Sequence, residues 1–158
     1  MLTFEMTEET IKSVMHALLK GDTFDAFYVR GMEIRLFTQF EISGVLNQSC
    51  YSEEEWEKLG RVYCLWSELK RYAFDMLKGS QKPQLLKIIF SLPDEAARAI
   101  HENAAALFLN LAFTENKLCF IAAASPKNFS LDKSVDLLWE EYIRRFFQTN
   151  GWSANMLA

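Results

Sequence analysis

Two runs of alternating apolar residues, separated by two polar residues, constrain the fold of this chain most strongly. Apolar residues occupy every second position over 107–113 and again over 118–124. Successive side chains of a strand point to opposite faces, so each set lies on one face of its strand. A two-residue turn at Glu115-Asn116 would place Phe113 opposite Leu118 and bring both sets onto one face. The sequence therefore predicts a β-hairpin with one strongly apolar face.

The opposite face of this hairpin is not polar enough for free contact with water. It carries Phe108, Asn110, Cys119 and Ile121, together with two alanines. We therefore expect a helix, a further layer of strands or a second subunit to cover it. These four residues are candidates for an interface. Trp152, which lies outside every periodic pattern, is a further interface candidate.

The rest of the chain alternates between helical and strand patterns. A short strand is expected at 2–6, a hairpin at 27–46 with its loop at 37–39, and a strand at 86–92, while five apolar stripes of period 3.6 predict helices between them. This order predicts an α+β fold with a mainly antiparallel sheet of about five or six strands and about four or five helices packed mostly on one face. Residues 1–151 are expected to form a single domain, and 152–158 a C-terminal tail.

Composition limits the class of protein. Half of the 158 residues are hydrophobic and 14% are aromatic, which is typical of a globular domain. The formal net charge of −4 lacks the basic excess of a nucleic-acid-binding protein. Neither a secretory leader nor an apolar run of roughly 18 residues is present, so no membrane segment is expected. Three widely spaced cysteines suit reduced thiols in the cytoplasm.

Motifs that carry chemistry are absent from the sequence. It has no Walker A loop, no G-x-G-x-x-G, no G-x-S-x-G and no C-x-x-C. His101-Glu102 begins like the zinc motif H-E-x-x-H, but position 105 is alanine. The other histidine, His16, is distant in sequence. No catalytic residue, no metal ligand and no cofactor is predicted.

Four lysines are the candidates for ligand or anion binding. Lys78 and Lys82 flank the loop after one predicted helix, and Lys127 and Lys133 flank the loop before the last. Lysine side chains and helix N-termini both attract anions. The alternative is that all four are solvated surface residues, which is the usual state of a lysine. The sequence favours this alternative.

Six segments are distinctive when taken together: FEISGVLN (40–47), YSEEE (51–55), WSELK (66–70), LKG..KP (77–83), LFLNL (107–111) and NFSLDKS (128–134) with Trp139. They resemble a known family of single-domain bacterial proteins of about this length whose function is unknown. The resemblance covers nearly the whole chain and implies a bacterial, cytosolic protein, but it brings no activity, cofactor or catalytic residue. The family pattern has a Thr-Gly segment where this chain has Ala122-Ala123-Ala124, and Lys-Pro where it has Lys70-Arg71.

Three functions are compatible with these observations. The sequence favours a non-enzymatic binding or interaction domain that self-associates as a homo-oligomer, because catalytic patterns are absent and one hairpin face is half apolar. The first alternative is a nucleic-acid-binding domain that uses a local basic patch. The second is a small enzyme whose pocket is assembled from residues distant in sequence, which spacing cannot reveal. A small-molecule ligand, if there is one, is not identified.

Overall fold

The protein is built on one antiparallel β-sheet, seen here in a computed structural model that describes residues 1–79 and 81–157. The sheet has eight strands in the order β3-β2-β5-β6-β7-β1-β8, and β4 pairs with β2 beside this path. The predicted α+β class is confirmed, with more strands than expected. The strands are β1 (Leu2–Met6), β2 (Tyr28–Arg35), β3 (Gln39–Ser43), β4 (Cys64–Leu65), β5 (Leu85–Ser91), β6 (Ala104–Thr114), β7 (Lys117–Pro126) and β8 (Ala154–Leu157).

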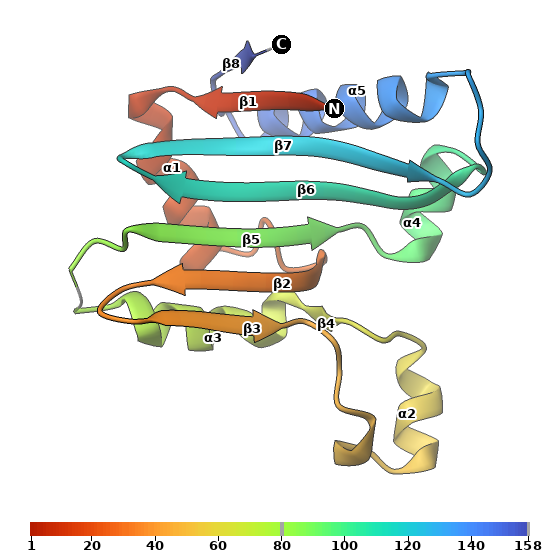
Figure 1. Cartoon of the computed structure of the whole chain (residues 1–158), viewed down its shortest axis with the longest axis horizontal. Coiled ribbons are helices and arrows are strands. Elements are labelled where there is room, and N and C mark those ends of the chain that lie inside the picture. Colours follow the sequence, from red (N-terminus) through yellow and green to blue (C-terminus); the bar gives the residue numbers. More distant parts are fainter. Residues whose placement is uncertain (80, 158) are drawn as a thin grey trace.

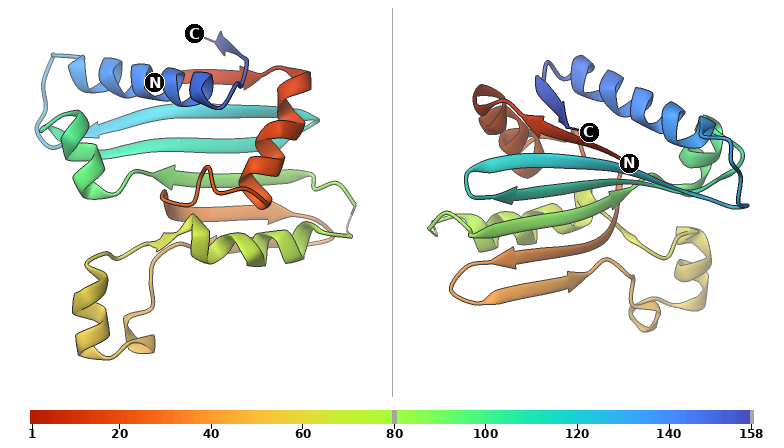
Figure 2. Two further views of the ribbon diagram at one scale, coloured as in Figure 1. Left: turned by 180° about the vertical axis from the view of Figure 1, so that it is seen from behind. Right: turned by 45° about the horizontal axis from the view of Figure 1, so that its top comes forward.

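The helices are distributed unevenly over the sheet. Figure 1 shows α1, α3 and α5 behind the sheet, and the view from behind in Figure 2 shows the same three helices in front of it. α4 lies at one end of the sheet, and η1 and α2 extend beyond its β3 side. Within the described residues, no helix covers the face that points to the viewer in Figure 1. The helices are α1 (Glu8–Leu19), η1 (Gln48–Cys50), α2 (Glu53–Leu59), α3 (Trp66–Leu77), α4 (Asp94–Ile100) and α5 (Ser134–Thr149).

The core lies between the sheet and these three helices, and aromatic rings dominate its centre. Phe24, which follows α1, is fully buried and stacks on Phe90 of β5 with ring centroids 5.3 Å apart. The buried indoles of Trp66 and Trp139 donate hydrogen bonds to the backbone carbonyls of Leu18 and Phe108. These bonds satisfy the two indole N–H groups, whose burial without an acceptor would destabilise the fold.

The β6–β7 hairpin has the predicted register. Phe113 lies opposite Leu118 and Leu111 opposite Phe120, and all four side chains are buried on the helix side. Glu115 and Asn116 form the turn with φ values of 51° and 63°. Two positive φ values are the signature of a type I′ turn, whose twist matches that of the strands it joins.

The hairpin at β2–β3 has a different register from the predicted one. The sequence pattern places Leu36 opposite Phe40 and Arg35 opposite Glu41, but in the structure Arg35 pairs with Gln39 and Glu33 with Glu41. The backbone N–H of Leu36 donates to the carbonyl of Thr38 at 3.0 Å, so the turn begins one residue earlier. Both registers keep the apolar side chains on the same face, which is why alternation alone could not separate them.

The C-terminal residues are part of the sheet and of the core. Residues 154–157, expected in a tail, form β8 and pair with β1. Trp152 is only 6% exposed, and its ring stacks on Phe24 with centroids 5.6 Å apart. Its indole N–H donates to the hydroxyl of Ser13 on α1 at 3.1 Å. Trp152 is therefore a core residue and not the interface residue that the sequence suggested.

Candidate functional site

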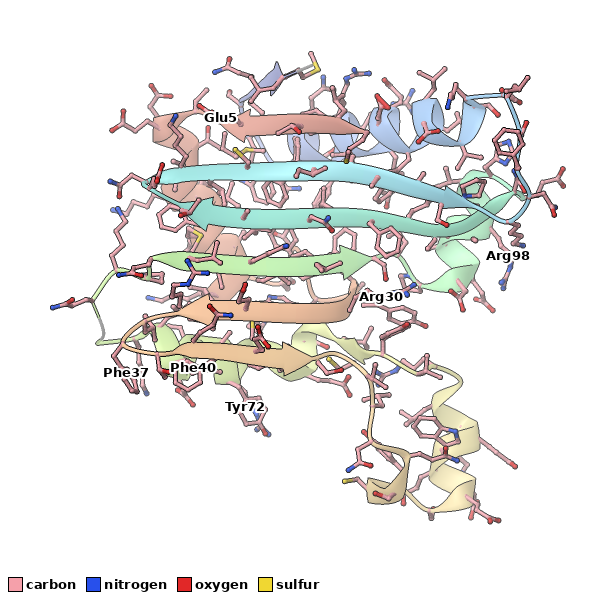
Figure 3. The ribbon with its side chains drawn as sticks, in the orientation of Figure 1. Glu5, Arg30, Phe37, Phe40, Tyr72 and Arg98 are labelled. Carbon is pink, nitrogen blue, oxygen red and sulfur yellow. The ribbon has the colours of Figure 1, made fainter. Side chains whose placement is uncertain are left out.

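The open face, meaning the side chains on the uncovered side of the sheet, is organised by the strand register into rows that cross the strands. The aromatic row contains Ser91, Phe108 and Ala123. The central row, in strand order from β3, is Ser43, Gly31, Ile89, Asn110, Ile121, Thr3 and Leu157. The charged row is Glu41, Glu33, Lys87, Ala112, Cys119, Glu5 and Asn155. Figure 3 shows the side chains of the sheet from this side, with Glu5 labelled on β1.

The middle of the open face is apolar. Its central patch consists of six residues around Asn110, each of which is partly exposed to solvent: Ile89, Phe108, Ala112, Cys119, Ile121 and Ala123. The structure thus brings together four of the predicted interface residues, namely Phe108, Asn110, Cys119 and Ile121. An antiparallel sheet that faces water normally carries polar residues on that face, so the apolar centre is unusual.

Asn110 lies at the middle of the central patch with an unsatisfied polar atom. Its Oδ1 is buried and accepts no hydrogen bond from the described residues. Ile89 and Ile121 are its direct neighbours on β5 and β7, and neither can donate a hydrogen bond from its side chain. A buried acceptor without a donor costs about 1–3 kcal/mol. The position therefore suits a donor that comes from outside the chain.

Arg30 stands at the β2 end of the aromatic row. The pairing of β2 with β5 shifts between Val29 and Gly31, which identifies Arg30 as the extra residue of a bulge. Its guanidinium donates to the buried Ser91 hydroxyl and to Tyr63, each at 2.9 Å. It also lies over the rings of Tyr63 and Phe108, 4.1 and 5.1 Å from their centroids. Figure 3 labels it at one end of β2. Within the described residues, Arg30 forms no ion pair.

Acidic residues gather beside Arg30 on the same face. Glu33 lies directly opposite Glu41 in the β2–β3 pair, an arrangement of like charges that opposes strand pairing. Lys87 is the neighbour of Glu33 on β5. These four charged residues line a shallow hollow of about 510 Å³ together with Gly31, Met32, Ile42, Ser43 and Ile89. The charged corner, as we call Arg30, Glu33, Glu41 and Lys87, thus holds charges of both signs in a small area.

The thiol on the open face is not activated as a nucleophile. Burial, and to a lesser extent the charge of Glu5, raises the pKa of Cys119 above its usual value. Burial likewise raises the pKa of Cys64. A raised pKa lowers the thiolate fraction, and the thiolate is the reactive form. These two cysteines have the character of packing residues.

The four predicted ligand lysines do not come together. Lys82 lies at the β6–β7 turn, where its ammonium bonds the Asn116 side chain and lies 5.4 Å from the ring centroid of Phe113. Lys78 pairs with Asp75 at 3.2 Å. Lys127 and Lys133 follow the far end of β7, where the Lys127 N–H donates to the Asn103 carbonyl. Lys82 and Lys127 therefore lie at opposite ends of the longest hairpin.

Lys82 stands beside two further hollows at its end of the sheet. One, of about 600 Å³, is lined by Leu36, Phe37, Phe40, Met76, Gln81, Lys82 and Gln84. The other, of about 670 Å³, includes Ile11, Met15, Leu19, Leu77 and Phe113. Figure 3 shows Phe37 and Phe40 at this edge. Both hollows are large enough for a small ligand. The charged group of the first is Lys82, and the second is lined by Glu8, Lys12 and Lys82 as well as by its apolar residues.

A serine, a histidine and an aspartate meet at the other end of the sheet without forming a catalytic triad. Ser134 Oγ lies 3.2 Å from His101 Nε2 and donates to Asp132 Oδ2 at 2.9 Å. His101 Nδ1 accepts the backbone N–H of Asn103 at 2.9 Å, so the neutral ring carries its proton on Nε2. The ring then donates to Ser134 and cannot take its proton, as a general base must. The bonds to Ser134 lower the pKa of Asp132 and tie the loop to α5.

Among the described residues, no group of three or more His, Cys, Asp or Glu side chains has a geometry that could hold a metal ion. None of the helices in the part of the chain that the structure describes is long and apolar enough to cross a membrane.

Comparison with known proteins gives one match. The model of a family of unknown function, DUF5721, matches residues 17–153, which is most of the chain. Searches of the curated proteins and of the solved structures found nothing that matches the chain. The match agrees with the resemblance drawn from the sequence segments, and it supplies no activity for the open face.

Sequence reasoning missed part of the open face. The sequence does not identify Arg30 and Lys87 as site residues. Their neighbours on adjacent strands depend on the strand order, which the sequence does not reveal. The charged side chains of the β2–β3 hairpin lie next to the central patch, which the alternation within that hairpin does not predict. On β5 the available signal is Lys87, the single charged residue of that strand.

Proposed function

The chain belongs to the DUF5721 family of unknown function, and on the geometry of its sheet we propose that it is a non-enzymatic interaction domain that self-associates through the open face. The observation that carries the proposal is the central patch, an apolar area on a face without covering helices in the described chain. Contiguous apolar area on a protein surface marks an interaction site. Asn110, with its unsatisfied buried oxygen, adds a polar anchor within that area.

The size of the open face supports a protein partner. The seven strands of the main path, spaced about 4.8 Å apart, span roughly 29 Å, and eight residue steps along β6 span roughly 27 Å, so the face covers on the order of 800 Å². A stable protein interface buries about 800 Å² on each partner. An apolar centre with a charged edge is also the usual layout of such interfaces.

Light scattering combined with size exclusion tests the proposal. We expect a dimer at micromolar concentration, and a monomer when Ile121, at the middle of the face, is replaced by arginine. A charge there would be buried without a partner, which interfaces do not tolerate. Glu9→Arg, an exposed position on α1, is the matched control and should leave the dimer intact. A wild-type chain that stays monomeric at high concentration would exclude self-association.

The two alternatives have less support. The basic patch needed for nucleic acid would require the four lysines together, whereas Lys82 and Lys127 lie at opposite ends of the β6–β7 hairpin. The open face itself carries Glu5, Glu33 and Glu41. A hydrolytic enzyme would need a base beside Ser134, but the tautomer of His101 opposes this role. We also propose a cytoplasmic location, in line with three free cysteines.

A further inference from the structure

We infer that two copies of the chain pack open face to open face about a two-fold axis that runs along the central row, so that Asn110 meets Asn110 and Arg30 meets the acidic pair Glu33 and Glu41 of the other copy. This inference rests on the proposed self-association and specifies its geometry. Face-to-face sheets pack about 10 Å apart with their strand directions nearly aligned. For such a pair the two-fold axis lies between the sheets, either across the strands or along them.

The central row is suited to lie on the axis. On an axis across the strands, Ile89, Asn110 and Ile121 each face the same residue of the second copy. A side-chain amide has both a donor and an acceptor, so two asparagines can bond each other reciprocally. The partner's Nδ2 would then supply the donor that the buried Oδ1 of Asn110 lacks. The isoleucines on either side would exclude water from this pair.

The same axis matches large side chains with small ones. It exchanges the aromatic row of one copy with the charged row of the other, because these rows flank the central row on opposite sides. Phe108 would then face Ala112, and Cys119 would face Ala123. An axis along β6 would instead place Phe108 against Phe108, where two large rings meet. Close packing of an interface requires the first arrangement, since voids and overlaps both cost stability.

Charge separates the two axes most clearly. With the axis across the strands, Arg30 faces Glu33 and Glu41 of the second copy. Arg30 forms no ion pair with the described residues of its own chain, and Glu33 and Glu41 are like charges that lie opposite each other in one chain. Along the strands, β2 faces β1 of the second copy, because these strands lie at equal distances on either side of β6. Glu33 would then meet Glu5 in the charged row. Like charges at an interface cost several kcal/mol, so the axis across the strands is favoured.

Charge reversal at Glu33 distinguishes the two axes by the sign of its effect. We expect Glu33→Lys to raise the dimer Kd, measured by analytical ultracentrifugation, by about tenfold or more, since close interfacial charge pairs are coupled by at least about 1.5 kcal/mol. The stability of the subunit should change little, because Glu33→Lys replaces the repulsion from Glu41 by an attraction and the attraction to Lys87 by a repulsion. Glu5→Lys is the matched control in the same row and should leave the Kd within about twofold. A lower Kd for both variants would overturn our arrangement in favour of the other axis.

Cross-linking locates the axis independently. In a chain with all three native cysteines changed to serine, Thr3→Cys should link two copies through a short bis-maleimide. Thr3 lies in the central row on β1, so it faces Thr3 of the second copy when the axis runs across the strands, whereas an axis along β6 would place it opposite Gly31 of β2. A chain that keeps only Cys119, in the adjacent row, should not link, since its two copies lie on opposite sides of the axis. A dimer in which the Cys119 chain links and the Thr3→Cys chain does not would overturn the arrangement while leaving self-association intact. A wild-type chain that is monomeric overturns both.

Discussion

The indole N–H of Trp152 donates a hydrogen bond to the hydroxyl of Ser13 at 3.1 Å, which joins residues 139 positions apart in sequence. Ser13 lies on α1, so the bond connects the second element of the chain to the segment that leads into the last. β1 completes the connection, since it pairs with β7 on one side and with β8 on the other. Both ends of the chain are therefore structural parts of the sheet that carries the open face.

Trp152 should be essential for stability. Its side chain is 6% exposed and lies against Phe24, Phe146 and Phe147. We expect Trp152→Ala to lower the free energy of unfolding by about 3–5 kcal/mol, the usual cost of removing a large buried aromatic side chain. Ser13→Ala, which removes only the hydrogen bond, should cost about 1 kcal/mol. Urea denaturation followed by fluorescence or circular dichroism measures both, and equal effects would contradict the packing role.

A glycine is required where β3 ends. A Cβ atom added to Gly44 would lie 1.6 Å from the carbonyl oxygen of Val29, which is backbone and cannot move without disturbing β2. We expect Gly44→Ala to destabilise the chain by roughly 3 kcal/mol. Gly60, with φ of 62° and no atom within 4 Å of an added Cβ, is the control, and Gly60→Ala should cost about 1 kcal/mol from backbone strain alone. A smaller loss at Gly44 than at Gly60 would show that the close approach is absent.

The turn of the β6–β7 hairpin can be improved. Glu115 has a positive φ of 51°, which costs free energy for glutamate and far less for asparagine. We expect Glu115→Asn to raise the free energy of unfolding by about 0.5–1 kcal/mol, because asparagine is favoured at this position of a type I′ turn. Glu115→Val should have the opposite sign, since a β-branched residue is least tolerant of positive φ. Thermal denaturation measures the two shifts.

The hairpins show how far sequence determines this fold. For β6–β7, a two-residue turn and two alternating strands leave one register, which is the observed one. For β2–β3, two registers satisfy the same alternation, and the difference between them depends on the bond from Leu36 to Thr38 at the tip. Local pattern thus specifies which side chain faces the core, and turn geometry specifies which residues are partners.

The candidate site was only partly predictable for a related reason. Phe108, Asn110, Cys119 and Ile121 belong to one hairpin, so alternation alone puts them on one face. Their association with Arg30 and Glu33 depends on β5 lying between β2 and β6, a long-range pairing without a local signal. Trp152 was predicted to be an interface residue because it follows no periodic pattern, and its stacking on the distant Phe24 has no local signal.

Asn103 should hold the loop that follows β7. Its side chain donates to the Asn128 carbonyl at 3.2 Å and accepts the Asn128 N–H at 3.1 Å, while Phe129 and Leu131 beyond it are 90% and 86% exposed. We expect Asn103→Ala to increase amide hydrogen exchange over 127–133 by about tenfold, since two lost hydrogen bonds are worth about 1–3 kcal/mol. Asn103→Asp, which keeps only the acceptor, should give a smaller increase. Unchanged exchange in the alanine variant would show that other bonds hold the loop.

The bidentate pair of Arg61 and Glu68 should make stability depend on pH. Arg61 donates to both carboxylate oxygens at 2.8 and 3.0 Å, and this bonding lowers the pKa of Glu68 below its usual value of 4.5. Because the folded-state pKa is the lower one, the stabilisation is fully present above about pH 4.5 and disappears as the pH falls through the folded value. We therefore expect the difference in unfolding free energy between wild type and Glu68→Gln to be largest near pH 7 and to shrink below pH 4.5. Urea titrations at several pH values measure this difference in unfolding free energy.

Glu54→Gln, which breaks an exposed pair with Lys58, is the control and should give a difference near zero at every pH. A difference for Glu68 that does not change with pH would contradict the role of the pair.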